Sequence, residues 1–292
     1  MDTPDTPRAV AVAVGVADVR REPDPATELV TQALLNTPAT AGQIAGDWTH
    51  VVLPDYTGWI RSVELVEPPT RGSSGSGRTG ITPPGLVAVV TVPRTVLYAG
   101  ATGSGVLSKV YLSTVLPLLD VTQPERVQVV LPGGTVAWLN RADAAIRQQD
   151  EPYVRQPISV VTGYARAFLD VPYLWGGTSF EGIDCSGLVQ LCHRMGGTLI
   201  PRDADQQHDF LAQSVQREEI REGDLIFFGS KAITHVALAL NNREYIHAEG
   251  QNYNRVVINS FDPHDAHYSP RLDEIVWAIK RTGDREHSIK SL

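Results

Sequence analysis

The sequence has few cysteines and methionines, no excess of positive charge and no long apolar run. Its 292 residues include 2 Cys and 2 Met. With 25 Lys and Arg against 33 Asp and Glu, the formal net charge is −8 at pH 7. This excess of negative charge disfavours binding to nucleic acid and passive attachment to an anionic cell wall. No stretch has the apolar length needed to cross a bilayer, so no membrane partner is expected.

Both cysteines, Cys185 and Cys192, are expected to be free thiols. If they share a helix, seven residues separate them by about 10 Å, which is beyond disulfide reach. Free thiols suit a reducing compartment. Residues 1–8 are rich in Asp, Thr and Pro and lack the basic flank of a signal peptide. The expected location is cytoplasmic, with a periplasmic or secreted location as the alternative if an export segment precedes this sequence.

Neither a metal site nor a phosphate-binding loop is expected. The adjacent Cys192 and His193 lack the paired spacing of a zinc site, and His264 and His267 lie in a loop-like stretch. The glycine-rich stretch 72–80 follows no strand pattern and opens no helix, so a flexible linker is the better interpretation. No cofactor is therefore expected.

An internal repeat organises the first half of the chain. The segment VVLP occurs at 51–54 and again at 129–132, an offset of 78, and each copy is followed within eight residues by a tryptophan, Trp59 or Trp138. Both copies consist of short β-branched runs broken by Gly, Pro and Asp, a pattern typical of small antiparallel barrels. The sequence therefore predicts two small all-β domains that resemble bacterial SH3-like barrels.

The expected chain organisation is multidomain because 292 residues exceed the usual size of one core. Apolar positions at helical spacing follow residue 158, and short strand-like runs come after them, which indicates an α+β domain. The predicted order is SH3-like domain 1 at 9–67, a linker at 68–85, SH3-like domain 2 at 86–141, a linker at 142–157, and the α+β domain at 158–281.

Two helices and five strands are expected in the α+β domain. One helix covers 158–168, and a second contains 188–195 and ends at Gly196-Gly197. The expected strands, each bounded by turn residues, are 225–228, 234–240, 245–247, 256–259 and 274–279.

The start of the second helix is a candidate catalytic position. Asp184 can cap the free backbone amides, which places Cys185 in the first helical turn. The partial positive charge of a helix N-terminus favours the thiolate, and the amides there can bind an oxyanion. A free cysteine is more often a small buried apolar residue, however, so the assignment needs catalytic partners.

Two histidines are candidates for those partners. His235 lies in an alternating strand and His247 in the next one, with the turn at 241–243 midway between them. Such a hairpin places the two side chains opposite each other or one diagonal step apart on one sheet face. A nucleophile, a base and a group that orients the base form the minimal arrangement for thiol acyl chemistry. The alternative is that both are ordinary core or surface histidines.

Six segments in order resemble the NlpC-family cysteine peptidases of the papain clan. They are YLWGG at 173–177, DCSGL at 184–188, PRD at 201–203, GDLIFF at 223–228, THVA at 234–237 and YIHA at 245–248. The resemblance implies a papain-like NlpC catalytic domain in which Cys185 attacks the carbonyl, His235 is the general base and His247 orients it. It also implies that Tyr173 assists the oxyanion.

The tandem SH3-like pair resembles the subgroup of γ-D-glutamyl-L-diamino acid endopeptidases. That resemblance implies murein peptide substrates, L-Ala-γ-D-Glu-L-Lys or the meso-diaminopimelate equivalent, with a free amine on L-Ala. It implies that Asp184, Glu28 and Tyr56 recognise the amine. From spacing alone, Glu28 fits an ordinary surface charge equally well, and Tyr56 fits a packing residue of the barrel equally well. The other residues expected at the substrate pocket are Ser186, Trp175, Arg202 and Asp203.

The expected function is hydrolysis of the γ-D-glutamyl-L-diamino acid bond in murein peptide recycling. An exported peptidoglycan hydrolase is one alternative, and a signal peptide upstream would favour it. A wall-binding adaptor with an inactive C-terminal domain is the other alternative, and the intact Cys185, His235 and His247 set counts against it.

Overall fold

The computed structural model describes residues 7–68 and 85–283, which belong to two compact units, Met1–Pro152 and Tyr153–Leu292. Each unit is treated by itself. The predicted linker 68–85 lies, except for its end residues, outside the described residues. In the part of the chain that is described, no helix combines the length and the apolar character that crossing a membrane requires.

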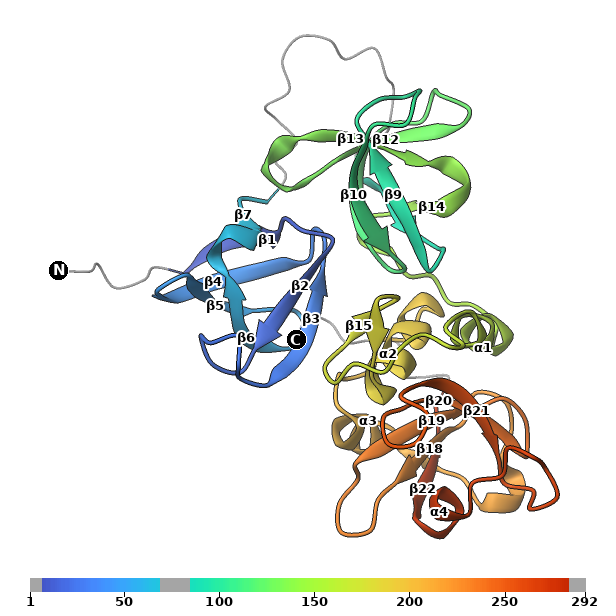
Figure 1. The fold of residues 1–292 in the computed structure, drawn as a ribbon. Coiled ribbons are helices and arrows are strands. Elements are labelled where there is room, and N and C mark those ends of the chain that lie inside the picture. Colours follow the sequence, from blue (N-terminus) through green and yellow to red (C-terminus); the bar gives the residue numbers. More distant parts are fainter. Residues whose placement is uncertain (1–6, 69–84, 284–292) are drawn as a thin grey trace. The chain divides into compact units, whose positions relative to one another are not determined.

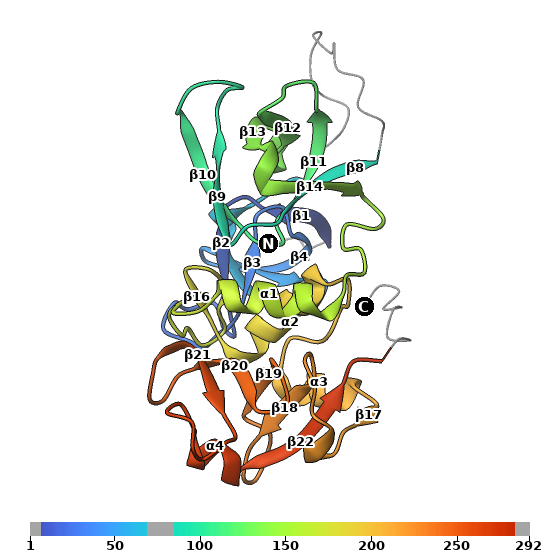
Figure 2. The same cartoon turned by 90° about the vertical axis from the view of Figure 1, so that its right-hand side faces the viewer.

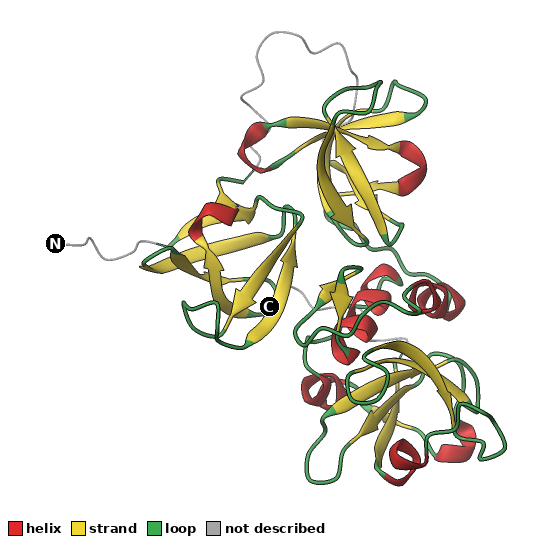
Figure 3. Cartoon of the chain, viewed as in Figure 1, coloured by secondary structure: helices red, strands yellow, loops and turns green. Residues whose placement is uncertain are grey.

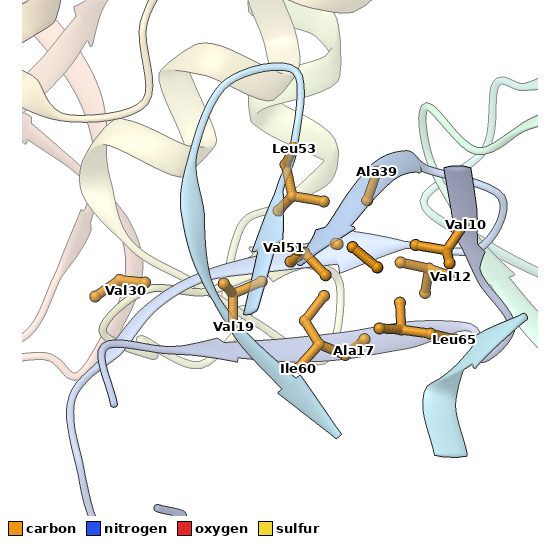
Figure 4. Packing of buried hydrophobic residues seen from close by; sticks show 12 residues of the cluster. Val10, Val12, Ala17, Val19, Val30, Ala39, Val51, Leu53, Ile60 and Leu65 are labelled. Carbon is orange, nitrogen blue, oxygen red and sulfur yellow. The ribbon is translucent and has the colours of Figure 1, made fainter. Parts of the chain in front are cut away.

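Seven antiparallel strands form the first sheet of the N-terminal unit, which Figure 1 draws in blue. Their order across the sheet is β3-β2-β6-β5-β4-β1-β7. Alternating side chains of these strands build the core in Figure 4, in which Ala17 and Val19 of β2 face Val51 and Ile60. The strand bounds are β1 Arg8–Val12, β2 Val16–Arg20, β3 Leu29–Leu34, β4 Pro38–Ala45, β5 Trp48–Val52, β6 Thr57–Arg61 and β7 Leu65–Val66.

A second seven-stranded sheet repeats this arrangement, with the order β10-β9-β13-β12-β11-β8-β14. Each label is that of the first sheet raised by seven, so the strand order is the same. Figure 3 shows both sheets with only short helical turns between strands. The bounds are β8 Leu86–Val90, β9 Arg94–Tyr98, β10 Val106–Tyr111, β11 Val115–Asp120, β12 Arg126–Val130, β13 Val136–Asn140 and β14 Ala144–Gln148.

The sequence repeat corresponds to equivalent places in the two sheets. Val51 lies on β5 and Val129 on β12, which occupy the same position in the strand order. The turns after β3 and β10 also agree, because Asn36 (φ 65°) and Ser113 (φ 76°) both adopt the left-handed region. A non-glycine residue is uncommon there, so the shared conformation supports a duplicated unit.

The predicted linker 142–157 needs correction, because its first part is a strand. Strand β14 pairs antiparallel with β8 over five residues, from Ala144 opposite Val90 to Gln148 opposite Leu86. It completes the second sheet as β7 completes the first. Its burial does not alternate between faces, so the periodicity that identifies strands is missing from its sequence.

The C-terminal unit consists of helices packed on a six-stranded sheet of order β17-β22-β18-β19-β20-β21. Helix α2 contacts α1, β19 and β20 and is the central helix of this unit (Figures 1 and 2). The helices are α1 Ile158–Ala167, α2 Cys185–Met195, α3 Ala204–Phe210 and α4 Pro270–Glu274. The sheet strands are β17 Gln213–Ser214, β18 Leu225–Phe228, β19 His235–Ala239, β20 Glu244–Glu249, β21 Arg255–Ser260 and β22 Val276–Arg281, and β15 Thr178–Ser179 pairs with β16 Gly182–Ile183.

The main expected elements of this unit are present, and the differences concern short segments. Helices α3 and α4 and strands β15, β16 and β17 were not predicted. The strand expected from residue 274 begins at Val276, because Glu274 is the last residue of α4. These segments have two to seven residues, too few for a periodic pattern to be recognised.

Candidate active site

The first turn of α2 carries the candidate nucleophile. Asp184 has extended backbone dihedrals (φ −96°, ψ 178°), and its side chain accepts a hydrogen bond from the backbone N–H of Gly187. This is an N-cap, and it begins the helix at Cys185, as the sequence predicts. The Cys185 side chain is buried, with 7% exposed. The backbone amides of Val236 and Ser186 lie close enough to its sulfur to lower the pKa of the thiol.

A buried ion pair holds Asp184 in place. Arg202 Nη1 lies 3.0 Å from Asp184 Oδ1 and Nη2 lies 2.7 Å from Oδ2, a bidentate geometry that adds direction to the attraction. The backbone N–H of Gly176 also donates to Oδ2, over 2.9 Å. The Arg202 side chain is only 1% exposed. The Asp184 carboxylate is therefore both charge-compensated and hydrogen-bonded inside the protein.

Ser186 joins the same network. Its Oγ donates to Asp184 Oδ1 over 3.3 Å and accepts from Arg202 Nη1 over 2.9 Å. A close approach of two chain segments accompanies this contact, because a Cβ added at Gly187 would lie 2.5 Å from the carbonyl oxygen of Gly177. Glycine at position 187 is thus required for the loop bearing Gly176 and Gly177 to reach Asp184.

The two candidate histidines are hydrogen-bonded to each other. His235 begins β19 and His247 lies on β20, and His235 Nε2 is 2.7 Å from His247 Nδ1. The register pairs Leu238 with Ile246 and Ala239 with Tyr245. Continued by one residue, it places His247 opposite Ala237, one diagonal step from His235. This is one of the two arrangements that the hairpin pattern predicts.

The nucleophile and the histidine pair meet at β19. Helix α2 packs on β19, the backbone amide of Val236 lowers the pKa of the Cys185 thiol, and Val236 directly follows His235 in that strand. Tyr173 lies near the same place. Its ring is so close to Gly250, the residue after β20, that a Cβ there would contact it. The pKa of Tyr173 is raised mainly by burial and secondly by the charge of Cys185. Cys185, His235, His247 and Tyr173 therefore come from four segments that converge on one site.

Burial disfavours the charged forms of the catalytic candidates. It raises the pKa of the Cys185 thiol to about 12, with a further contribution from the Asp184 charge. Burial is also the main reason that the pKa of His235 is well below its usual range and that of His247 falls to about 4. The sequence predicts a thiolate favoured by the helix N-terminus. The backbone amides of Ser186 and Val236 do lower the pKa of the thiol, but burial outweighs them.

Two polar side chains near the histidines were not predicted from the sequence. Asn259 on β21 lies with its Oδ1 2.9 Å from His247 Nε2. Glu249 is 3% exposed, and it accepts hydrogen bonds from the backbone N–H groups of Gln251, Asn252 and Tyr253. Arg271 donates to Glu249 over 3.2 Å.

A spacing signal for Asn259 does exist. His235, His247 and Asn259 are each 12 residues apart, and the β20–β21 register pairs Tyr245 with Asn259 and His247 with Val257. Asn259 is thus one diagonal step from His247, as His247 is from His235. Equal hairpins in a meander place equally spaced residues along one diagonal of a sheet.

The remaining predicted pocket residues of this unit lie on connecting segments. Trp175 is 59% exposed, before β15. Asp203 occupies the N-cap position of α3 without capping it through its side chain. In the part of the chain that is described, no group of three or more His, Cys, Asp or Glu residues is arranged to hold a metal ion.

Glu28 and Tyr56 belong to the N-terminal unit. Glu28 pairs with Arg21 across the turn between β2 and β3, with 2.6 Å between Arg21 Nε and Glu28 Oε2. Tyr56 is partly buried against the core of the first sheet. Their predicted part in binding the substrate amine stays a prediction.

Comparison with known proteins identifies the family. Residues 170–274 match the NlpC/P60 family, and residues 19–65 match the bacterial dipeptidyl-peptidase Sh3 domain. The chain is 32% identical over 238 residues to a γ-D-glutamyl-L-lysine dipeptidyl-peptidase of Bacillus cereus, covering 76% of this chain and 68% of that protein. The chain belongs to the NlpC/P60 family. It is a peptidase of that family, and its N-terminal sheet region is SH3-like.

Further similarities agree with this membership. A γ-D-glutamyl-L-lysine dipeptidyl-peptidase of Bacillus subtilis is 26% identical over 235 residues, 75% of this chain and 71% of that protein. The crystal structure of an NlpC/P60 family protein from Bacillus cereus has a TM-score of 0.80 at 24% identity and covers 94% of this chain and 99% of that one. The latter shows a common fold over nearly the whole chain.

Proposed function

We propose that this NlpC/P60 peptidase hydrolyses the γ-D-glutamyl-L-diamino acid bond of cell-wall peptides that carry a free N-terminal L-Ala. The observation that carries the proposal is the meeting of Cys185 with the hydrogen-bonded pair His235 and His247, in a chain similar along most of its length to a γ-D-glutamyl-L-lysine dipeptidyl-peptidase. The diamino acid is L-Lys or meso-diaminopimelate. We further propose that the enzyme recycles peptide fragments inside the cell.

The proposed mechanism proceeds through a thioester. The sulfur of Cys185 attacks the γ-carbonyl carbon of D-Glu while His235 takes the thiol proton. Burial disfavours the charged forms of both groups, so we propose that the proton moves as the sulfur attacks. The imidazolium of His235 then protonates the departing amine of the diamino acid. Water, activated by the same histidine, hydrolyses the thioester and restores the thiol.

We assign the stabilisation of the oxyanion to Tyr173 and to backbone amides at the start of α2. The raised pKa of the Tyr173 phenol keeps it protonated, so it can donate a hydrogen bond to the developing negative charge. The Cys185 backbone amide lies in the first turn of α2, where amides have no partner within the helix. These are the two kinds of donor that acyl-transfer sites use.

In the pocket, we propose a bracing role for Arg202 and Ser186. Their contacts with Asp184 support it, since they hold the residue next to the nucleophile. The family resemblance is the support for recognition of the substrate amine by Asp184, Glu28 and Tyr56, and for contacts from Trp175 and Asp203. Residues 19–65, which match a dipeptidyl-peptidase Sh3 domain, include Glu28 and Tyr56.

We infer that the second sheet is a further SH3-like barrel, which makes the chain two small all-β barrels followed by an α+β domain. Its strand order, identical to that of the first sheet, supports this. The proposed domains are 9–67, 86–148 and 158–281. The second differs from the sequence-based boundary by the inclusion of β14.

The test is mass spectrometry of the products from L-Ala-γ-D-Glu-L-Lys. The expected products are L-Ala-γ-D-Glu and free L-Lys, and none with Cys185→Ser. Cleavage at another bond would overturn the proposed specificity. An exported peptidoglycan hydrolase is the second candidate. Its peptidoglycan substrate is supported by 36% identity over 109 residues, 33% of this chain and 45% of that protein, to the peptidoglycan endopeptidase RipB of Mycobacterium tuberculosis. That candidate requires cleavage of peptides that remain attached to peptidoglycan.

A further inference from the structure

A line of buried hydrogen bonds continues beyond His247 and ends on the protein backbone. Asn259 Nδ2 donates to the carbonyl oxygen of His267 over 2.7 Å. That contact needs a donor, so the amide nitrogen of Asn259 must face His267 and its Oδ1 must face His247. His247 and Asn259 are 0% and 1% exposed, so these contacts are shielded from bulk solvent.

The orientation of Asn259 determines which nitrogen of His247 carries the proton. Because Oδ1 of Asn259 can only accept, His247 Nε2, 2.9 Å away, must donate. Burial holds the pKa of His247 at about 4, so the ring is neutral near pH 7 and has one proton only. Its Nδ1 is therefore unprotonated, and its lone pair can accept a hydrogen bond.

The same reasoning continues to His235. His247 Nδ1 accepts, so His235 Nε2, 2.7 Å away, must donate to it. The neutral His235 ring then has its lone pair on Nδ1. That nitrogen is the one nearer the His235 backbone, and the next backbone amide, that of Val236, is close enough to the Cys185 sulfur to lower the pKa of the thiol.

We propose that Asn259 is a positioning residue that acts through His247 to hold His235 as the Nε2–H tautomer, which leaves Nδ1 free to take the proton of Cys185. The proposal rests on the proposed thiol mechanism and deepens it. Asn259 touches neither the substrate nor Cys185. Its effect is to select one of two tautomers that differ in whether a base faces the sulfur.

An amide suits this position better than a carboxylate. A carboxylate at 259 would favour a charged His247, whose two nitrogens both donate. His247 would then donate to His235 Nε2, and the remaining proton of His235 would move to Nδ1, where the base is needed. The other charged groups that act on the pair are Arg271 on α4, which acts on both rings, and Glu249 on β20, which acts on His247. Neither of them determines which nitrogen of His247 is protonated.

The direct test is the ¹⁵N NMR spectrum of the histidine rings in the full-length protein at neutral pH. Wild-type protein should show the Nε2–H tautomer for both His235 and His247. An Nδ1–H tautomer at either ring in the wild type would overturn the proposal. This measurement needs no substrate, so it stands or fails separately from the assignment of the cleaved bond.

Two variants separate positioning from simple packing. Asn259→Leu removes the acceptor, so both tautomers should be populated, and kcat should fall by about 10- to 100-fold with a smaller change in KM. Asn259→Asp should shift the acid limb of the pH–rate profile upward and regain activity at higher pH, where His247 is again neutral. A purely structural Asn259 predicts unchanged tautomers and an unshifted acid limb in both variants.

Gln190→Met is the matched control. Gln190 is a buried amide, 4% exposed, whose Nε2 donates to the carbonyl oxygen of Ile200 over 3.2 Å. Its loss removes a comparable buried hydrogen bond from the same unit. The control should lower stability without changing either tautomer. A control that changes the His235 tautomer as Asn259→Leu does would contradict the assigned role.

Discussion

At the scale of single residues, the two cysteines differ in their surroundings and therefore in their expected roles. Cys185 contacts the backbone of β19 and lies beside Asp184, whereas Cys192 is fully buried two turns further along α2. Burial alone raises the pKa of the Cys192 thiol. A neutral, inaccessible thiol is a small apolar side chain in practice.

Substitution of each cysteine tests this difference. Cys185→Ser should abolish hydrolysis with little change in the free energy of unfolding, because the side chains are similar in size. Cys192→Ala should keep its activity and lose about 1 kcal/mol of stability from reduced packing. Product assays and denaturant unfolding check both, and turnover by Cys185→Ser would exclude the thioester mechanism.

His247→Ala tests the orienting role. His235 Nε2 would lose the acceptor that His247 Nδ1 provides, so the ring would adopt both tautomers and kcat should fall by about 10- to 1000-fold without reaching zero. In the wild type, kcat should depend on pH in a bell shape set by the coupled Cys185 and His235 protons. Kinetics equal to wild type at every pH would show that His247 has no such role.

At the scale of elements, the sequence predicts those parts whose signals are local. The N-cap at Asp184 and the stop at Gly196-Gly197 delimit α2, and the hairpin centred near residue 241 brings His235 to His247. These features depend on short-range chemistry that a sequence displays directly. The start of α2 and the histidine pair could therefore be predicted.

The features that the sequence did not reveal depend on contacts between residues far apart in the chain. Strand β14 shows no alternation and forms because β8, more than 50 residues earlier, offers a free edge. The bond between Arg202 and Asp184 spans 18 residues. In the sequence, Asn259 looks like an ordinary polar residue at the end of a strand. Its position beside His247 becomes clear only from the register of β19, β20 and β21. Periodicity within a window contains none of this information.

The bond between Arg202 and Asp184 joins the segment before α3 to the start of α2, so its loss should affect both elements. Arg202→Met leaves the buried Asp184 carboxylate without its cation, which typically costs about 3–5 kcal/mol. Thermal or denaturant unfolding measures this cost. Arg281→Met is a useful comparison, because Arg281 forms an ion pair with Asp224 elsewhere in the same unit. Equal activity per folded molecule in the wild type and Arg202→Met would exclude a bracing role at the site.

At the scale of the whole molecule, buried neutral histidines make the fold sensitive to acid. His193 is 1% exposed, its Nδ1 lies 2.9 Å from the carbonyl oxygen of Val189, and burial lowers its pKa from 6.5 to about 4. A histidine with a lowered folded-state pKa binds its proton more readily when unfolded. Its contribution to stability is therefore complete above pH 6.5 and is lost as the pH falls toward 4.

His193→Gln should flatten part of that dependence, because glutamine does not titrate and can donate to the same carbonyl. The measurement is the free energy of unfolding between pH 7 and pH 4, compared with the wild type. The catalytic histidines remain in the variant, so part of the slope should persist. An unchanged slope would mean that His193 has the same pKa in the folded and unfolded states, which would contradict the effect of its burial.

In the proposed function, the SH3-like region contributes to substrate selection. An ammonium group held by carboxylates gains charge-assisted hydrogen bonds, and an N-acetyl group in its place leaves those carboxylates unpaired. N-acetyl-L-Ala-γ-D-Glu-L-Lys should therefore lose at least about 100-fold in kcat/KM, or roughly 2.7 kcal/mol, relative to the free peptide. A peptide still joined to muramic acid should lose as much.

Glu28→Ala and Tyr56→Ala locate the origin of that selectivity. Each should lower kcat/KM for the free-amine peptide far more than for the N-acetylated peptide, because the blocked peptide never makes the interaction that is removed. Arg21→Ala is the control for Glu28, since it removes the partner of Glu28 in the β2–β3 turn and leaves the carboxylate itself in place. If the wild type and the two variants all prefer the free-amine peptide to the same degree, the enzyme is selective for the amine but the assignment of that selectivity to Glu28 and Tyr56 is wrong. Equal cleavage of free and blocked peptides by the wild type would instead contradict recycling and favour an enzyme that acts on intact peptidoglycan, in which L-Ala has no free amine.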